Sequence, residues 1–293
     1  MSARVKLIFS MFLFGTIGLF VRQIPLPSSI IALVRAAIGM LFLMLVLLMQ
    51  RKRPSWTAIR DNLKTLVLSG TAMGFNWILL FEAYRYTTVA IATLCYYFSA
   101  IFVIVASPLL LKEKLTPFKA ACAGVSLFGM ILVSGVLDGG AEGFNAMGVA
   151  LGLGAAVLYA TVVLLNKKLK SIDSFDTTIS QLAIAAIVLL PYVLLTEKTA
   201  SLALSPVGLS MLLTVAILHT GIAYAMYFSS FKSLKAQTVA LISYLDPVVA
   251  LFLSIFVLGE PMSTTGMIGA VLVLGAMASS ELLKIPSETN MKG

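Results

Sequence analysis

The chain has 293 residues, of which 60% are hydrophobic and only 11% are charged. Soluble domains carry about 25% charged residues, so this composition excludes an ordinary water-soluble enzyme. The net charge of +9 does not indicate a nucleic-acid-binding domain, because the Lys and Arg residues lie scattered between long apolar runs.

Ten apolar runs follow one another along the chain and leave too few residues for a second folded domain. A helix needs about 20 apolar residues to cross a bilayer, and none of these runs alternates like a barrel strand. We therefore predict an all-α polytopic membrane protein with ten transmembrane helices. The predicted spans are Val5–Val21, Ser28–Met49, Leu63–Ala83, Thr87–Leu111, Pro117–Val136, Met147–Leu165, Thr178–Thr196, Val207–Phe231, Ala236–Leu258 and Ser263–Leu283.

The distribution of basic residues predicts the orientation. With the N-terminus in the cytoplasm, seventeen of the 21 Lys and Arg residues fall in cytoplasmic segments, three in external ones, and Arg35 inside the second span. Such an excess is typical of cytoplasmic loops. We expect a multi-pass protein of the cytoplasmic membrane with both termini in the cytoplasm.

The second half of the sequence repeats the first. At an offset of 147, Trp77 matches Tyr224, Tyr97 matches Tyr244 and Glu113 matches Glu260. At 146, Arg35 matches Gln181, and at 145, Phe14 matches Tyr159 and Arg22 matches Lys167.

Two units of five spans each must have opposite orientations in the membrane, because five is odd. This inverted repeat is the architecture of many secondary transporters. The predicted units are residues 1–137 and 147–284, followed by a short cytoplasmic tail at 285–293.

Several short stretches carry a family resemblance that covers almost the whole chain. They are Phe14-Gly15-Thr16, Leu33-Val34-Arg35-Ala36, Tyr96-Tyr97-Phe98-Ser99, Tyr244-Leu245-Asp246-Pro247 and Leu258-Gly259-Glu260-Pro261. With them the sequence resembles the drug/metabolite transporter superfamily, in its ten-span branch with two EamA-type domains, although Ala100 stands where that family often has Pro. The resemblance implies movement of small organic solutes, often outward, through a central cavity walled by both repeats. It does not identify the solute.

Asp246 is the acidic residue nearest the middle of a predicted span. A carboxylate there costs roughly 2.5–3.5 kcal/mol on insertion scales. Pro247 removes one amide donor and frees the carbonyl of Ser243 one turn earlier. A broken helix with an acid at mid-depth is typical of a cation or substrate site, and a structural bond to a neighbouring hydroxyl is the alternative.

Other polar and aromatic side chains fall at similar depth. Tyr97 and Tyr244 are repeat mates, as are Trp77 and Tyr224, and with Tyr96 they are candidates to line a cavity for a planar or cationic solute. Helix packing is the alternative reading. Asn76 and His219 are further candidates, and His219 could accept a proton or simply hydrogen-bond within the bundle.

Residues that lie at similar depths in different predicted spans suggest two gates or structural latches. Arg35 is expected to pair with Glu260 near the outer surface, and Gln181 to face Glu113 near the inner one. Snorkelling of Arg35, or its contact with a substrate carboxylate, stays open as an alternative.

We therefore predict a secondary transporter for small organic solutes (amino acids, metabolites or amine-type drugs) that exports them by alternating access. The alternatives are an uptake carrier or exchanger for a cationic or zwitterionic solute, a channel, a non-transport membrane protein and an intramembrane enzyme. Catalysis is not expected, because a single histidine excludes H-E-x-x-H and no G-x-S-x-G is present. We expect no cofactor, metal or nucleic-acid partner. Proton coupling and the choice between monomer and homodimer are left open.

Overall fold

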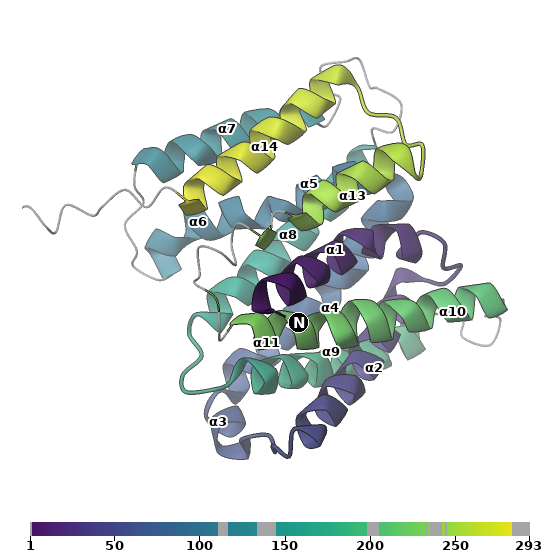
Figure 1. The fold of residues 1–293 in the computed structure, drawn as a ribbon, viewed down its shortest axis with the longest axis vertical. Coiled ribbons are helices and arrows are strands. Elements are labelled where there is room, and N and C mark those ends of the chain that lie inside the picture. Colours follow the sequence, from purple (N-terminus) through teal and green to yellow (C-terminus); the bar gives the residue numbers. More distant parts are fainter. Residues whose placement is uncertain are drawn as a thin grey trace, which may run out of the picture.

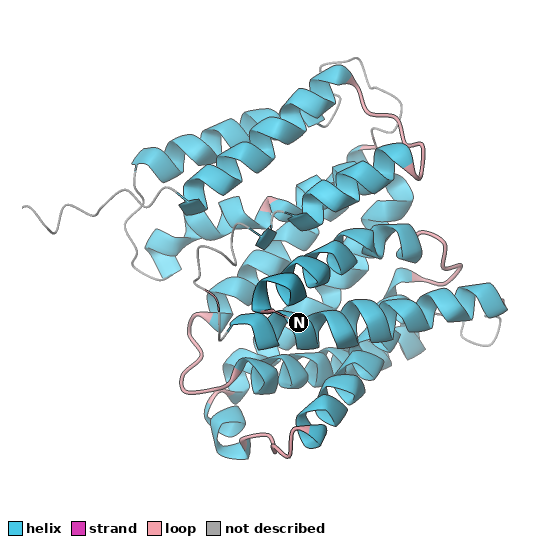
Figure 2. Ribbon diagram, viewed as in Figure 1, coloured by secondary structure: helices cyan, strands magenta, loops and turns pink. Residues whose placement is uncertain are grey.

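The computed structural model describes residues 2–110, 117–133, 145–197, 205–231, 234, 242–243 and 245–282. Every regular element in these ranges is helical (Figure 1, Figure 2). The helices are α1 (Ala3–Val21), α2 (Ser28–Met49), α3 (Trp56–Asp61), α4 (Leu63–Tyr86), α5 (Val89–Tyr97), α6 (Ser99–Leu110), α7 (Pro117–Val133), α8 (Ala146–Asn166), α9 (Ser174–Thr196), α10 (Pro206–Thr214), the π-helix η3 (Val215–Ile222), α11 (Ala223–Phe231), α13 (Leu245–Phe256) and α14 (Thr264–Leu282).

Six helical stretches in the described part of the chain are long and apolar enough to cross a membrane. They are Ala3–Val21, Ser28–Met49, Leu63–Tyr86, Ala146–Asn166, Ser174–Thr196 and Pro206–Tyr227. Shorter apolar helices cover Val89–Val103, Ala120–Val133, Leu245–Phe256 and Thr264–Ala276, within the other predicted spans. The prediction of an all-helical, multi-pass membrane protein is confirmed, and the count of ten spans stays a prediction.

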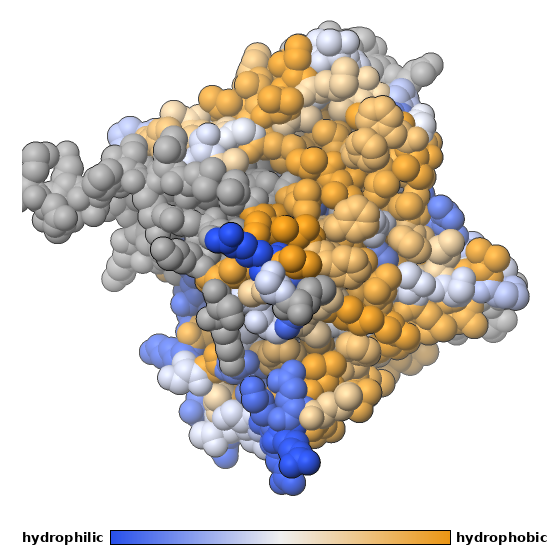
Figure 3. Space-filling view, viewed as in Figure 1, coloured by the Kyte–Doolittle hydropathy of each residue, from blue (hydrophilic) through white to orange (hydrophobic). Residues whose placement is uncertain are grey.

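The surface is that of a protein in lipid. Large apolar side chains such as Leu195 (86% exposed) and Met49 (75% exposed) point outward. Hydrophobic residues cover most of the face seen in Figure 3, and hydrophilic ones gather near α3 and the end of α2. The basic connections therefore lie at the end of an apolar band, as the hydropathy pattern predicts.

Short polar residues mark where several helices begin. Thr88 accepts a hydrogen bond from the amide of Ile91 at 3.1 Å, Asp173 from Phe175 at 2.9 Å and Ser205 from Gly208 at 3.0 Å. Each bond satisfies one of the amides that a helix start leaves without an internal partner. The starts of α5, α9 and α10 are thus encoded locally.

The structure divides two predicted spans. The fourth is split into α5 and α6 at Phe98, although no proline lies there. The eighth contains the π-helix η3, in which the Thr220 hydroxyl donates to the carbonyl oxygen of Val215 at 3.2 Å. π-Helical turns within longer helices are rare and occur often at functional sites.

The helix contacts follow a two-fold relation between the repeats. In the repeat, α1 corresponds to α8, α2 to α9, and α4 to the stretch that contains η3 and α11. The contact of α4 with α8 therefore corresponds to that of α1 with η3 and α11, and the contact of α4 with α9 corresponds to that of η3 with α2. Likewise, the contact of α1 with α13 corresponds to that of α8 with α5 and α6. In the pairs α2–α9 and α7–α14, each helix contacts its own counterpart in the other repeat. The repeat seen in the sequence is therefore also a repeat of packing.

The pair α7–α14 forms one edge of the bundle, at the top of Figure 1. The two helices approach so closely that a Cβ on Gly129 would lie 2.8 Å from the carbonyl oxygen of Gly269. Small residues of this kind allow close helix packing inside a membrane. The remaining helices surround the centre of the molecule.

Candidate functional site

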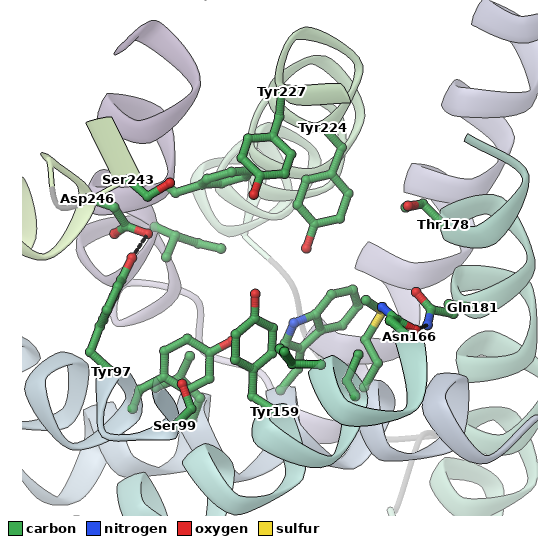
Figure 4. Close-up of a pocket in the computed structure, with 18 of the residues that line it drawn as sticks. Tyr97, Ser99, Tyr159, Asn166, Thr178, Gln181, Tyr224, Tyr227, Ser243 and Asp246 are labelled. Carbon is green, nitrogen blue, oxygen red and sulfur yellow. Dashed lines mark hydrogen bonds between the residues drawn. The ribbon is translucent and has the colours of Figure 1, made fainter. Parts of the chain in front are cut away.

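A cavity of about 720 Å³ lies between the two repeats. This volume is within the roughly 300–1,000 Å³ of small-molecule pockets. Its wall is largely apolar and aromatic, with a few polar groups that point inward (Figure 4).

The cavity wall repeats the two-fold relation. Positions matched by the sequence repeat face the cavity together, although their residue types often differ. These pairs are Phe14 and Tyr159, Arg35 and Gln181, Trp77 and Tyr224, Leu80 and Tyr227, Tyr96 and Ser243, and Ser99 and Asp246. The cavity therefore lies on the pseudo-two-fold axis.

Asp246 is in the first turn of α13, and its carboxylate points into the cavity (Figure 4). The hydroxyl of Tyr97 donates to Asp246 Oδ2 at 2.5 Å, so α5 of the first repeat and α13 of the second are joined there. Pro247 is buried as the third residue of α13, a position where its missing amide costs no internal hydrogen bond. Gly15 makes room for this turn, because a Cβ on it would lie 2.6 Å from the carbonyl oxygen of Asp246.

Arg35 lines the same cavity from α2 and is only 4% exposed. Its Nε donates to the Thr220 hydroxyl at 2.7 Å, and its guanidinium carbon lies 4.1 Å from the centre of the Trp77 ring. A hydroxyl and an aromatic face thus hold this cation in the interior. It does not snorkel outward.

The expected pair between Arg35 and Glu260 is wrong. Glu260 follows α13 and forms an ion pair with Arg22, the residue after α1. Depth along a span gives the height of a residue but not the direction in which its helix turns it, and α2 turns Arg35 toward the cavity. Among the described residues, the other ion pair joins Arg85 and Glu82.

Gln181 donates to the Ser69 hydroxyl at 2.8 Å and to Asn166 Oδ1 at 2.6 Å, beside the cavity. Its expected neighbour Glu113 lies outside the described residues, and so does Tyr244.

His219 and Asn76 are buried but do not line the cavity. His219 hydrogen-bonds to the Thr16 hydroxyl at 2.8 Å and to the Thr214 carbonyl at 3.3 Å. Asn76 donates to the carbonyl of Ala155 at 2.5 Å. Both side chains connect helices behind the cavity wall, which matches the packing alternative for these residues.

Several wall residues were not among the sequence candidates, notably Ser99, Tyr159 and Tyr227. Each is the repeat mate of another residue in the wall, so the repeat held a signal that could have found them. Within the described ranges, no group of three or more His, Cys, Asp or Glu side chains could hold a metal ion.

The cavity opens toward one end of the bundle. Its lining extends to Asn166 and Lys167 at the end of α8 and to Ile172 and Ser174 before and at the start of α9. We call this the basic end, because the connection after α8 also carries Lys168 and Lys170. The far end is the opposite one, where α1 and α13 end and α5 begins.

These features define a class: a polytopic membrane protein with a solute-sized cavity between two related helical repeats, as transporters have. A family model for the EamA-like transporter family matches residues 2–135 and 146–280. The chain belongs to this family, within the drug/metabolite transporter superfamily, and is a membrane transporter.

Curated relatives agree with this assignment. The chain is similar to the uncharacterized transporter YxxF of Bacillus subtilis (strain 168), with 31% identity over 285 residues, 94% of this chain and 88% of the relative. An uncharacterized transporter of Archaeoglobus fulgidus is 25% identical over 275 residues, 92% and 93% of the two chains. A solved crystal structure with 19% identity superposes at a TM-score of 0.68 over 94% of this chain and 95% of its own, which supports the fold.

Proposed function

We propose that this protein is a secondary transporter that exports small zwitterionic or cationic organic solutes across the cytoplasmic membrane by alternating access. The observation that carries the proposal is the pairing of opposite charges across one aromatic cavity. Arg35 comes from the first repeat and Asp246 from the second, and no ion pair joins them.

The chemistry of the wall suits an amino acid or an amine. The Asp246 carboxylate binds an ammonium group, and the Arg35 guanidinium binds a carboxylate. Trp77, Tyr96 and Tyr159 offer rings for the apolar body of the solute. An amine-type drug would use Asp246 and the rings without Arg35.

The cavity opens at the basic end, which is cytoplasmic if the excess of Lys and Arg sets the orientation. In this conformation solute would load from the cytoplasm, a step that export requires and that an uptake cycle also passes through. Export is proposed because the family that the sequence resembles often moves solutes outward. Exchange of the solute for a proton or for a second solute requires a group that binds either one on the return step. Asp246 suits this role because it lines the cavity, whereas His219 does not.

The test is solute flux in proteoliposomes, with and without a pH gradient, using labelled amino acids and quaternary amines. Asp246→Asn should abolish saturable flux, whereas Glu197→Gln, which changes a carboxylate outside the cavity, should not. Undiminished flux in folded Asp246→Asn protein would exclude Asp246 as the binding group. Flux that is equal in both directions at every gradient would favour a facilitated carrier over an exporter.

A further inference from the structure

Glu260 joins three helix ends at the far end of the protein. It is 8% exposed and forms the ion pair with Arg22 at the end of α1. Its Oε2 accepts a hydrogen bond from the amide of Val89, the first residue of α5, at 2.8 Å, and another from the Ser254 hydroxyl of α13.

The backbone is shaped to deliver this carboxylate. Gly259 has φ +63°, which L side chains rarely adopt, and the turn brings the Glu260 amide to 3.0 Å from the carbonyl of Ser254. The Ser254 hydroxyl also accepts from the amide of Ala90 at 3.2 Å. The end of α13 therefore satisfies the first two amides of α5, a helix of the other repeat.

The ends of α1 and α5 also touch directly. A Cβ on Gly18 would lie 2.5 Å from the Val89 side chain, so the two helices are in close contact where Arg22 and Glu260 meet. Among the described residues, Ile17 of α1 and Tyr84 of α4 line the cavity near this contact, whereas Arg22, Val89 and Glu260 do not line it. The contacts close the cavity there while it is open at the basic end.

We propose that Arg22 and Glu260 form an external latch, and that release of Glu260 from Arg22 and from the start of α5 opens the cavity to the far end. This rests on the proposed alternating-access function. Arg22 is suited to a reversible contact, because its side chain is 39% exposed and regains water when the pair separates. Glu260 gains water at the same step, so neither charge is left buried and alone.

The latch is connected to the solute site through two helices. α5 and α13 are tied at the far end by Glu260 and Val89, and inside the cavity by Tyr97 and Asp246. A solute ammonium that binds Asp246 competes with the Tyr97 hydroxyl and weakens the inner tie. The contacts at the far end, with Glu260 at their centre, then remain to hold these helices together, which links loading from the basic end to opening at the far end.

The test measures access to a cysteine in the cavity and needs no knowledge of the solute. Ser99→Cys, in a background with Cys95→Ala and Cys122→Ala, places one thiol in the cavity wall. A charged, membrane-impermeant thiol reagent is applied to right-side-out and inside-out vesicles. With the latch intact, labelling should occur mainly from the side of the basic end.

Glu260→Gln and Arg22→Gln should each raise the rate of labelling from the far end by roughly 5- to 150-fold, the range typical of a biased two-state equilibrium. The double variant should show no increase beyond the larger of the two single effects, because both substitutions remove the same Arg22–Glu260 ion pair. Glu82→Gln is the control, since it breaks the ion pair with Arg85 without touching α5 or α13.

Unchanged labelling in folded Glu260→Gln and Arg22→Gln proteins would overturn the latch, and so would an equal increase in Glu82→Gln. The proposed function is judged separately by solute flux that depends on Asp246. Altered labelling without any flux would leave the latch standing and the solute proposal refuted.

Discussion

Replacement of Arg35 by glutamine should separate zwitterions from simple amines. Phenylalanine and phenethylamine share a ring and an ammonium group, and only the amino acid has a carboxylate for Arg35. Arg35→Gln removes the cation while leaving a side chain that can still reach the Thr220 hydroxyl. We therefore expect weaker transport of phenylalanine and little change for phenethylamine.

The magnitude follows from the contact that is lost. A hydrogen bond to a charged group contributes about 1.5–3 kcal/mol, and each 1.36 kcal/mol is a factor of ten, so KM for phenylalanine should rise roughly 10- to 150-fold. The contact of the guanidinium with Trp77 is also lost, at about 0.5–2 kcal/mol. That second loss acts on protein stability and on both compounds alike, so the ratio of the two KM values isolates the carboxylate contact.

The assay is competition by both compounds against one labelled substrate in proteoliposomes. Arg85→Gln is the matched control, because Arg85 is a cation at the far end that donates to the carbonyl of Leu26 and does not line the cavity. An equal loss for phenylalanine and phenethylamine would refute the reasoning and leave Arg35 as a structural residue only.

Three further changes test other parts of the site. Tyr97→Phe should tighten binding of an amine at Asp246, because the ammonium no longer competes with the Tyr97 hydroxyl. The control is Tyr192→Phe, which changes an exposed tyrosine of α9 that does not line the cavity, and weaker amine binding by Tyr97→Phe alone in competition assays would contradict this. His219→Gln should lower the free energy of unfolding by about 0.6 kcal/mol, typical of one hydrogen bond between membrane helices, and leave KM unchanged. Thermal unfolding and solute flux would be measured on the same His219→Gln protein, and a raised KM would contradict the packing role of His219. Gly15→Ala should cost about 1–3 kcal/mol of stability, since its Cβ would meet α13 at Asp246; an unchanged melting temperature would mean that α1 and α13 separate without cost.

The fold was largely readable from the sequence, because hydropathy and repetition act over many residues. The apolar runs gave the helices, and the matches Trp77–Tyr224 and Arg35–Gln181 correctly paired positions that face one cavity. Asp246 could also be singled out, since a carboxylate within an apolar run is costly without a role.

What could not be predicted depends on rotation and on distant contacts. The break at Phe98 has no local signal, because the helix ends there only in the context of its neighbours. The π-helix η3, with the bond from Arg35 to Thr220, likewise depends on how α2 packs against it. Arg22 was counted as an orientation signal, and only the folded chain brings it to Glu260.

The two halves of the cavity match in position but not in charge. Arg35 faces Gln181 across the pseudo-axis, and Asp246 faces Ser99. Two identical five-helix units would carry each charge twice and would treat a solute the same in either direction. Because both repeats belong to one chain, one half can hold the cation and the other the anion, which makes the cavity a fixed dipole. Under the proposed function, a zwitterion would bind in one orientation only, and the same end of the molecule would lead each time it crosses the membrane.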